Sequence, residues 1–425
     1  MPEKQNLVAF PRSARKRKQL LLAAESLKLR RLTRLRSLTG WLLAVSILLF
    51  TAVHFTLFTP ASIVQNFRIV RTALTGSDGV AEGTVIYPAG SAGAAAPIAG
   101  GLAVLDDEGL SVIHLGGASQ QIEAMGYASP ALQSNGGYLL AFDRGAYDLS
   151  LCSPLSTVFS LTLRSPIVTA SLGSEGTFCV VTDEVGYKSA VTVYSTVSRE
   201  DDHHLWRWRS ADYYVQDAAL SPSGTHLCAL TFQQNGAQLE TTLQFFDLNA
   251  DTVRAAVPLG SAVGYTVRWL DDSRVAVVTD QAAYAVDRRT GAKTAAASYA
   301  AADLLGFAFG NDGFVVAQRS FSGTERASVT RYDKEGAARA TLSLSSDPQS
   351  LSYVNGRLGV LTANGLYVYD GAMKPDWKNG SAAAAQRVTL TEDGGAWLYY
   401  PKYAQRVTAS SARSEEFTDD NANPD

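Results

Sequence analysis

A run of two aspartates and two histidines, Asp201 to His204, holds the densest ligand chemistry in the chain. Carboxylate and imidazole groups bind zinc and other transition metals, so the run is a candidate metal site. Adjacent histidines seldom point at the same ion, however, and the whole sequence has five histidines. We therefore interpret the run as a loop, and we predict no metal ion and no cofactor.

Short acidic clusters recur along the chain and could supply paired carboxylates for acid–base catalysis or for calcium. They are Asp106-Asp107-Glu108, Asp271-Asp272, Asn311-Asp312 and Glu392-Asp393. Each falls at the tip of a predicted hairpin, where aspartate favours the turn geometry, so we interpret them as turns. The motifs H-E-x-x-H, G-x-S-x-G and G-x-x-x-x-G-K-[ST] do not occur in the sequence. The sequence therefore predicts a protein that is not an enzyme.

The most distinctive aromatic group consists of Trp206, Trp208, Tyr213 and Tyr214. Trp206 and Trp208 are two residues apart, so both side chains lie on one face of a predicted strand. Tryptophan and tyrosine are enriched among the residues that dominate binding at interfaces, so we predict an interface at these four positions. The alternative is that this outer strand packs within its own domain. If this alternative is correct, Trp206→Ala should lower the melting temperature and not only weaken partner binding.

The three cysteines, Cys152, Cys179 and Cys228, form no C-x-x-C pair. Their odd number argues against a disulfide framework, and free cysteine is among the most buried residue types. We predict three buried thiols.

Eight copies of one sequence pattern form the strands and turns that carry these residues. In each copy a short strand leads through a polar turn into a strongly apolar strand, as in VQDAALSPSGTHLCALT from Val215. The apolar strands begin near Leu102, Tyr138, Phe178, Leu227, Val275, Phe314, Arg357 and Ala396, at intervals of 36 to 49 residues. Such intervals are typical of four-stranded propeller blades.

The turns between these strands, such as SNGG, SPSG, GNDG and VNGR, contain Gly, Asn or Asp, which tolerate positive φ. Radial packing in a propeller buries both faces of sheets that are too small to be stable alone. We therefore predict an all-β fold, a β-propeller of about eight blades. Seven blades are the alternative count, and an array of β-sandwiches is the alternative architecture.

One apolar run precedes the repeats. Trp41 to Phe58 has 18 residues and no charge, which is near the lower limit for a membrane-spanning helix. Residues 1–40 carry 11 Lys and Arg against two Glu, a net charge of +9, and the remainder has 26 basic against 38 acidic residues, a net charge of −12. The positive-inside rule then predicts a single-pass signal anchor at the cell membrane, with a cytoplasmic N-terminus and an extracytoplasmic propeller.

The leucine-rich basic segment before this run is predicted to form a helix on anionic lipid. Its membrane-surface residues are Arg30, Arg31, Arg34 and Arg36. The acidic remainder is a poor candidate for nucleic acid. The predicted partners are therefore the lipid bilayer and a protein or peptide of the cell envelope.

Composition predicts five segments. They are a basic cytoplasmic tail at 1–40, a transmembrane signal anchor at 41–60, a flexible linker at 61–96, a β-propeller at 97–410 and an acidic disordered tail at 411–425. The linker is inferred from its Gly, Ala and Ser content, and Thr84 to Tyr87 is a candidate strand within it.

The combination of basic tail, anchor, glycine-rich linker and blades such as SLSYVNGRLGVLTANGLYVYD from Ser350 resembles one family of propellers. These are membrane-anchored bacterial propellers of Gram-positive, clostridia-like organisms, known only as a domain of unknown function. The blades are also similar to quinoprotein-type and WD-repeat-like propellers. The resemblance implies an envelope location and a binding fold, and it assigns no site residues.

We therefore predict a non-enzymatic scaffold that binds a protein or peptide at the cell envelope. Two alternatives stay open. One is a receptor or sensor for a small ligand in the propeller funnel. The other is an extracytoplasmic hydrolase or quinone-dependent oxidoreductase, because propellers host many activities.

Overall fold

The computed structural model describes residues 35, 38–46, 48, 83–98, 100–114, 119–198, 200–250, 253–299, 302–320 and 327–412. The chain divides into two compact units, Met1–Leu74 and Thr75–Asp425. In the first unit, residues 38–46 are helical. Among the residues that the structure describes, no helix combines the length and the apolar character needed to cross a membrane. Arg30, Arg31, Arg34, Arg36 and most of the predicted anchor lie outside the described residues.

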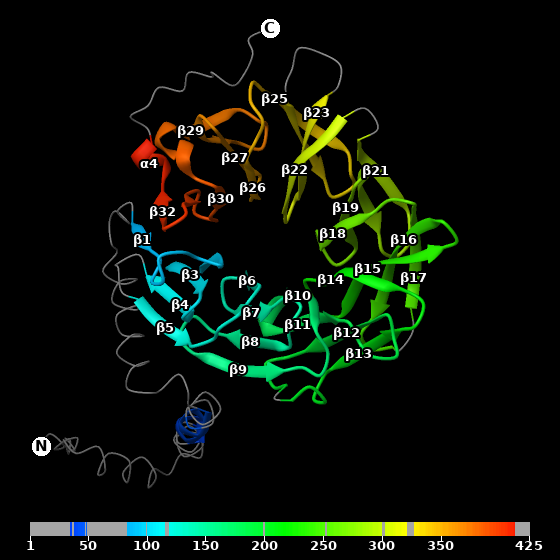
Figure 1. Cartoon of the computed structure of the whole chain (residues 1–425). Helices are drawn as coiled ribbons and strands as arrows, with labels where there is room; N and C mark the ends of the chain where they lie inside the picture. The colour runs from blue at the N-terminus through cyan, green and yellow to red at the C-terminus, as the bar shows by residue number, and fades with distance from the viewer. Residues whose placement is uncertain are drawn as a thin grey trace, which may run out of the picture. The chain divides into compact units, whose positions relative to one another are not determined.

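The second unit contains eight four-stranded antiparallel sheets, which are the blades of a propeller. Their innermost strands surround a central axis (Figure 1). The prediction of an all-β propeller is confirmed, with eight blades rather than seven.

In blades 1 to 7 the strands run in chain order from the innermost to the outermost. Blade 1 consists of β2 (Ala94–Ile98), β3 (Gly101–Asp106), β4 (Gly109–His114) and β5 (Ser119–Glu123), and blade 2 of β6 (Pro130–Ser134), β7 (Leu139–Asp143), β8 (Asp148–Cys152) and β9 (Thr157–Thr162). Blade 3 consists of β10 (Ile167–Leu172), β11 (Phe178–Thr182), β12 (Ser189–Tyr194) and β13 (Trp206–Ser210), and blade 4 of β14 (Tyr214–Leu220), β15 (His226–Asn235), β16 (Gln238–Asp247) and β17 (Val253–Gly260).

Blade 5 consists of β18 (Gly264–Trp269), β19 (Arg274–Thr279), β20 (Ala282–Asp287) and β21 (Lys293–Ser298), and blade 6 of β22 (Ala302–Gly310), β23 (Gly313–Ser320), β24 (Ala327–Asp333) and β25 (Ala338–Leu344). Blade 7 consists of β26 (Ser350–Val354), β27 (Arg357–Thr362), β28 (Gly365–Tyr369) and β29 (Pro375–Asn379), and blade 8 of β30 (Arg387–Leu390), β31 (Ala396–Tyr399), β32 (Tyr403–Val407) and β1 (Thr84–Ile86). The short helical turns are η2 (Ser174–Gly176), η3 (Gly380–Ala384) and α4 (Ala409–Ala412).

Blade 8 combines strands from both ends of the propeller. Its outermost strand is β1, which pairs with β32 so that Thr84 faces Gln405 and Ile86 faces Tyr403. The predicted boundary between a linker at 61–96 and a propeller at 97–410 is therefore wrong, because β1 and the beginning of β2 lie inside the predicted linker. Blade 8 needs a fourth strand, and the N-terminal segment supplies it from a distant part of the sequence.

The core consists of eight apolar clusters, one between each pair of neighbouring blades. The second strand of each blade is covered on both faces, which explains its continuous apolar sequence. In β3, for example, the four residues from Leu102 to Leu105 are fully buried. The predicted starts of these second strands agree with the structure to within one residue.

The turn between β26 and β27 shows why such predictions succeed. Asn355 and Gly356 have φ values of 50° and 75°. A two-residue hairpin turn with positive φ at both positions strongly favours the dipeptide Asn-Gly. Local turn chemistry therefore fixed the pairing of Val354 with Arg357.

The three cysteines are free and buried, as predicted. Cys179 in β11 and Cys228 in β15 donate to the carbonyl oxygens of Ala218 and Ala219, both at 3.6 Å. Burial raises the pKa of the Cys179 thiol to about 12 and holds that of Cys228 well above its usual range. These thiols therefore stay protonated and unreactive in the folded protein.

Candidate functional site

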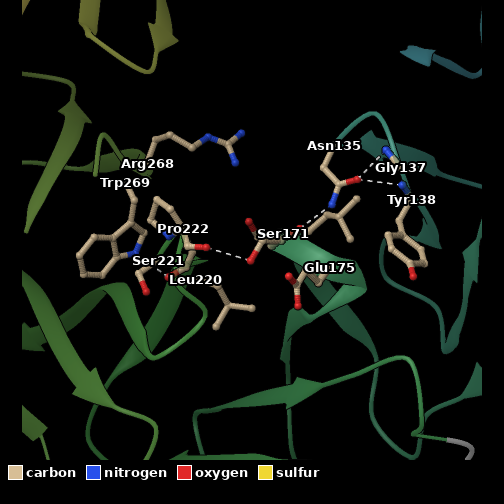
Figure 2. A pocket seen from close by; sticks show the side chains of 14 residues that line it. Asn135, Gly137, Tyr138, Ser171, Glu175, Leu220, Ser221, Pro222, Arg268 and Trp269 are labelled. Carbon is tan, nitrogen blue, oxygen red and sulfur yellow. Dashed lines mark hydrogen bonds between the residues drawn. The ribbon is translucent and has the colours of Figure 1, made fainter. Parts of the chain in front are cut away.

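A pocket of about 540 Å³ lies where the innermost strands of blades 2 to 5 end and turn into their second strands. Its size is in the range of small-molecule sites in proteins. Figure 2 shows the side chains that converge on it from four consecutive blades. The residues that define it are Asn135, Tyr138, Leu172, Glu175, Leu220, Pro222, Arg268 and Trp269.

Hydrogen bonds between neighbouring blades fix the wall of this pocket. Asn135 of blade 2 donates from Nδ2 to the Gly173 carbonyl of blade 3 at 2.7 Å. Ser174 Oγ donates to the Pro222 carbonyl of blade 4 at 2.9 Å, and Trp269 Nε1 of blade 5 donates to the Ala219 carbonyl at 2.9 Å. The wall is therefore held in place before any ligand arrives.

Arg268 is the cation of this pocket. It lies on β18 between the buried residues Val267 and Trp269, and its own side chain is exposed. In Figure 2 the side chain extends from β18 over the pocket. Asp217, on the neighbouring innermost strand β14, instead accepts hydrogen bonds from Thr266 Oγ1 at 2.7 Å and Val267 N at 3.0 Å. Burial raises the pKa of the Asp217 carboxyl, and the hydrogen bonds and the charge of Arg268 act against that rise.

A second candidate site lies at the other end of blades 2 to 5, where the innermost strands begin and where the β7–β8 and β11–β12 turns lie. Seven large apolar side chains there are each at least 42% exposed. We call this surface the tyrosine face, and its members are Tyr147, Val168, Val185, Tyr187, Tyr214, Val263 and Tyr265. The other described side chains of this kind in the propeller, Ile86, Val197, Leu205 and Val253, lie elsewhere on the blades.

Backbone contacts join the parts of the tyrosine face. The Gly145 N–H in the β7–β8 turn donates to the Ile167 carbonyl at the start of β10 at 2.7 Å. The Val215 N–H at the start of β14 donates to Ser189 Oγ at the start of β12 at 3.1 Å. The turns and strand starts that carry the exposed side chains of blades 2 to 4 are therefore neighbours.

Basic groups lie over the rings of two tyrosines of the tyrosine face. Tyr214 stacks on Phe232 with ring centroids 5.3 Å apart, and Lys188 Nζ lies 5.2 Å from the Tyr214 centroid. Arg209 Cζ lies 5.7 Å from the Tyr187 centroid. Cation–π contacts of this kind hold aromatic rings in position at an exposed surface.

The four aromatic residues predicted as an interface do not form one surface. Trp206 begins β13 and is 6% exposed, and its ring contacts Phe246 of blade 4 at a centroid distance of 5.2 Å. Trp208 contacts the same ring at 4.8 Å. Tyr214 belongs to the tyrosine face, and the half-buried Tyr213 directly precedes it. β13, which begins at Trp206, runs across the blade before the chain reaches these two tyrosines. The predicted role in binding stays a prediction, and Tyr214 is the member best placed for it.

The acidic and histidine run has four separate sets of contacts. Asp201 Oδ1 accepts from the Tyr194 hydroxyl at 2.6 Å and from Arg207 Nη2 at 2.5 Å. Asp202 pairs with the exposed Arg164, His203 lies 4.0 Å from Glu200, and His204 Nδ1 lies 3.2 Å from the Asp201 carbonyl oxygen. Within the part of the chain that the structure describes, no group of three or more His, Cys, Asp or Glu could hold a metal ion.

The clusters at Asp106 and Asp271 stabilise turns, as the sequence indicated. Asp106 Oδ1 accepts from the backbone N–H groups of Glu108 and Gly109 at 3.0 and 3.2 Å. Asp271 Oδ1 accepts from the N–H groups of Ser273 and Arg274 at 2.8 and 2.9 Å. These carboxylates therefore have structural partners within their own turns.

Residues 87–379 match the sequence profile of a family of unknown function, DUF5711. The chain belongs to this family. The predicted resemblance to a domain of unknown function is confirmed, and the predicted bacterial, clostridia-like source stays a prediction. No curated protein matches the sequence significantly.

Several solved structures are similar to this DUF5711 member in fold. A computationally designed protein, Ika8, is 12% identical with a TM-score of 0.53, over 76% of this chain and 98% of the designed one. A eukaryotic initiation factor is 12% identical with a TM-score of 0.51, over 72% and 80% of the two chains. BamB from Moraxella catarrhalis is 12% identical with a TM-score of 0.48, over 76% and 96%. At this identity the similarity to Ika8 and to the initiation factor shows a shared fold alone.

Proposed function

We propose that this protein is a membrane-anchored, extracytoplasmic scaffold that binds a protein or peptide partner through the tyrosine face. The observation that carries the proposal is the gathering of seven exposed apolar side chains at one end of four consecutive blades. Exposed apolar side chains that gather on one face of a domain mark interaction sites. Tyrosine and arginine, both present here, are enriched at the centres of such interfaces.

The anchor is supported by the first unit of the chain. In the helix at residues 38–46, Leu38, Trp41, Leu42 and Leu43 are each at least 59% exposed. Apolar side chains on several faces of one helix are stable in a lipid environment. The net charge of +9 on residues 1–40 supports a cytoplasmic N-terminus.

Photo-crosslinking in living cells tests the tyrosine face. A benzoylphenylalanine residue at position 265 of the full-length protein should give one discrete adduct. The same probe at position 205 should not, because Leu205 is exposed but lies between β12 and β13, at the other end of blade 3. Tyr214→Ala should weaken the adduct at position 265 by about tenfold, which is the effect of losing one strong interface residue. Equal adducts from both positions, or an adduct that Tyr214→Ala leaves unchanged, would contradict the proposal.

Cysteine labelling tests the topology, since the buried native thiols should not react with a membrane-impermeant maleimide. We expect Asn249→Cys, in the exposed β16–β17 turn, to be labelled in intact cells. Gln5→Cys should be labelled only after the membrane is permeabilised. The unmodified protein is the control and should stay unlabelled in both conditions. The opposite pattern would place the propeller in the cytoplasm.

A further inference from the structure

Two opposite charges face the pocket of Figure 2 without a hydrogen-bonded or ion-paired partner in the described part of the chain. No hydrogen bond or ion pair joins the Arg268 guanidinium or the Glu175 carboxylate to another described residue, and the two groups do not pair with each other. Most other charged side chains of the propeller that the structure describes are paired or bonded to the backbone, as Asp217 is. Both groups of the pocket are therefore free to bind a ligand.

Glu175 occupies its position against a local preference. Its φ is 52°, in the left-handed region that disfavours side chains, although a glycine follows it directly. The Gly173 N–H bonds to the Thr177 carbonyl at 2.7 Å, and the Thr177 N–H bonds to the Ser174 carbonyl at 3.0 Å, so the turn is well fixed. Residues in sparsely populated backbone regions such as this one cluster at active sites and ligand-binding sites.

The surface between the two charges is mainly apolar. Leu172, Leu220, Pro222 and Trp269 contribute to it, together with the ring of Tyr138. An apolar lining with a few polar groups at defined positions is the usual composition of a small-molecule site. The ligand should therefore carry one negative and one positive group together with an apolar side chain.

We propose that this pocket binds a small zwitterion with an apolar side chain, namely a free amino acid or a short peptide. Arg268 binds the carboxylate, for which the planar guanidinium offers two parallel N–H donors. Glu175 binds the ammonium group, and the apolar wall binds the side chain. The pocket and the tyrosine face lie at opposite ends of the blades, so this proposal does not depend on the partner-binding role.

Isothermal titration calorimetry on the full-length protein tests the proposal with four probes. L-leucine and the dipeptide Leu-Leu carry both charges, N-acetyl-L-leucine carries only the negative charge, and L-leucinamide carries only the positive one. We expect at least one of the two zwitterions to bind, and each singly charged probe to bind at least about tenfold more weakly, since one charge-assisted contact is lost. The preference between leucine and Leu-Leu identifies the length of the ligand.

Matched variants assign the two contacts. Arg268→Gln should weaken binding of the zwitterion and of N-acetyl-L-leucine but not of L-leucinamide. Glu175→Gln should weaken binding of the zwitterion and of L-leucinamide but not of N-acetyl-L-leucine. Arg289→Gln and Glu108→Gln remove exposed charges in turns outside the pocket and should change nothing. The proposal is overturned if neither zwitterion binds at millimolar concentration, or if N-acetyl-L-leucine binds as tightly as the zwitterions. Loss of binding in the control variants would overturn it equally.

Discussion

Replacing Val85 with aspartate will lower the free energy of unfolding of the propeller by about 4 kcal/mol, because a charge would be buried without a partner. Val85 is 3% exposed and lies in the apolar cluster between blades 8 and 1, with Trp397 and Tyr399. It is the central residue of β1, the strand that completes blade 8. Losing this strand leaves β32 with an unpaired edge and opens the cluster to water.

Ile86→Asp is the matched control, because Ile86 is the next residue of the same strand but is 74% exposed. Its effect should be below about 0.5 kcal/mol, as for most surface substitutions. Urea unfolding of the full-length variants, followed by tryptophan fluorescence, measures both, since Trp397 lies in the affected cluster. Similar unfolding midpoints for the two variants would show that β1 does not close the ring.

Asp201→Ala will lower the free energy of unfolding by about 3 kcal/mol at pH 7, because it leaves the Arg207 charge and the Tyr194 hydroxyl without their partner. The side chains of Asp201 and Arg207 are 12% and 14% exposed, so water compensates poorly. Asp202→Ala is the matched control. Its partner Arg164 is 75% exposed, and such surface pairs contribute at most about 1 kcal/mol. Equal effects of the two substitutions would contradict the structural role of Asp201.

The contribution of Asp201 also has a defined pH dependence. Burial acts to raise the pKa of its carboxyl, but the Tyr194 hydrogen bond and the Arg207 charge outweigh burial and lower the pKa below its ordinary value. A carboxyl with a lowered pKa stabilises the fold above its unfolded pKa of about 4, and this stabilisation is lost as the pH falls through the folded value. The difference in stability between the wild type and Asp201→Ala should therefore shrink between pH 5 and pH 3. An unchanged difference at pH 3 would mean that the carboxylate charge contributes nothing.

Sequence patterns predicted the second strands of the blades because their signals are local. A polar turn with Asn, Gly or Asp, followed by four or five apolar residues, identifies a strand that is buried on both faces. For the closing strand, the sequence indicated a candidate strand at Thr84 to Tyr87 but gave no signal for its pairing. Thr84–Ile86 has three residues within a glycine- and alanine-rich segment, and its partner is Tyr403–Gln405. Only the closed ring brings these two segments together.

The candidate sites were harder to predict for the same reason. Tyr187 and Tyr265 are single exposed residues on blades 3 and 5, and nothing in their immediate sequence distinguishes them, whereas Tyr214 was identified beside Tyr213. Arg268 and Glu175 meet at one pocket from blades that are 93 residues apart. The Trp206–Trp208 pair, in contrast, is conspicuous in the sequence but is covered by Phe246 of the next blade.

The pairing of β1 with β32 also sets the order of events during synthesis. Ile86 leaves the ribosome 317 residues before its partner Tyr403. At the usual elongation rate of 5 to 20 residues per second, the first strand waits roughly 15 to 60 s for the last. Throughout that interval the nascent ring is open, with one face of blade 1 and one face of the most recently made blade exposed to other chains. A ribosome that stalls at any codon before Tyr403 therefore releases a product that cannot close, however many complete blades it contains.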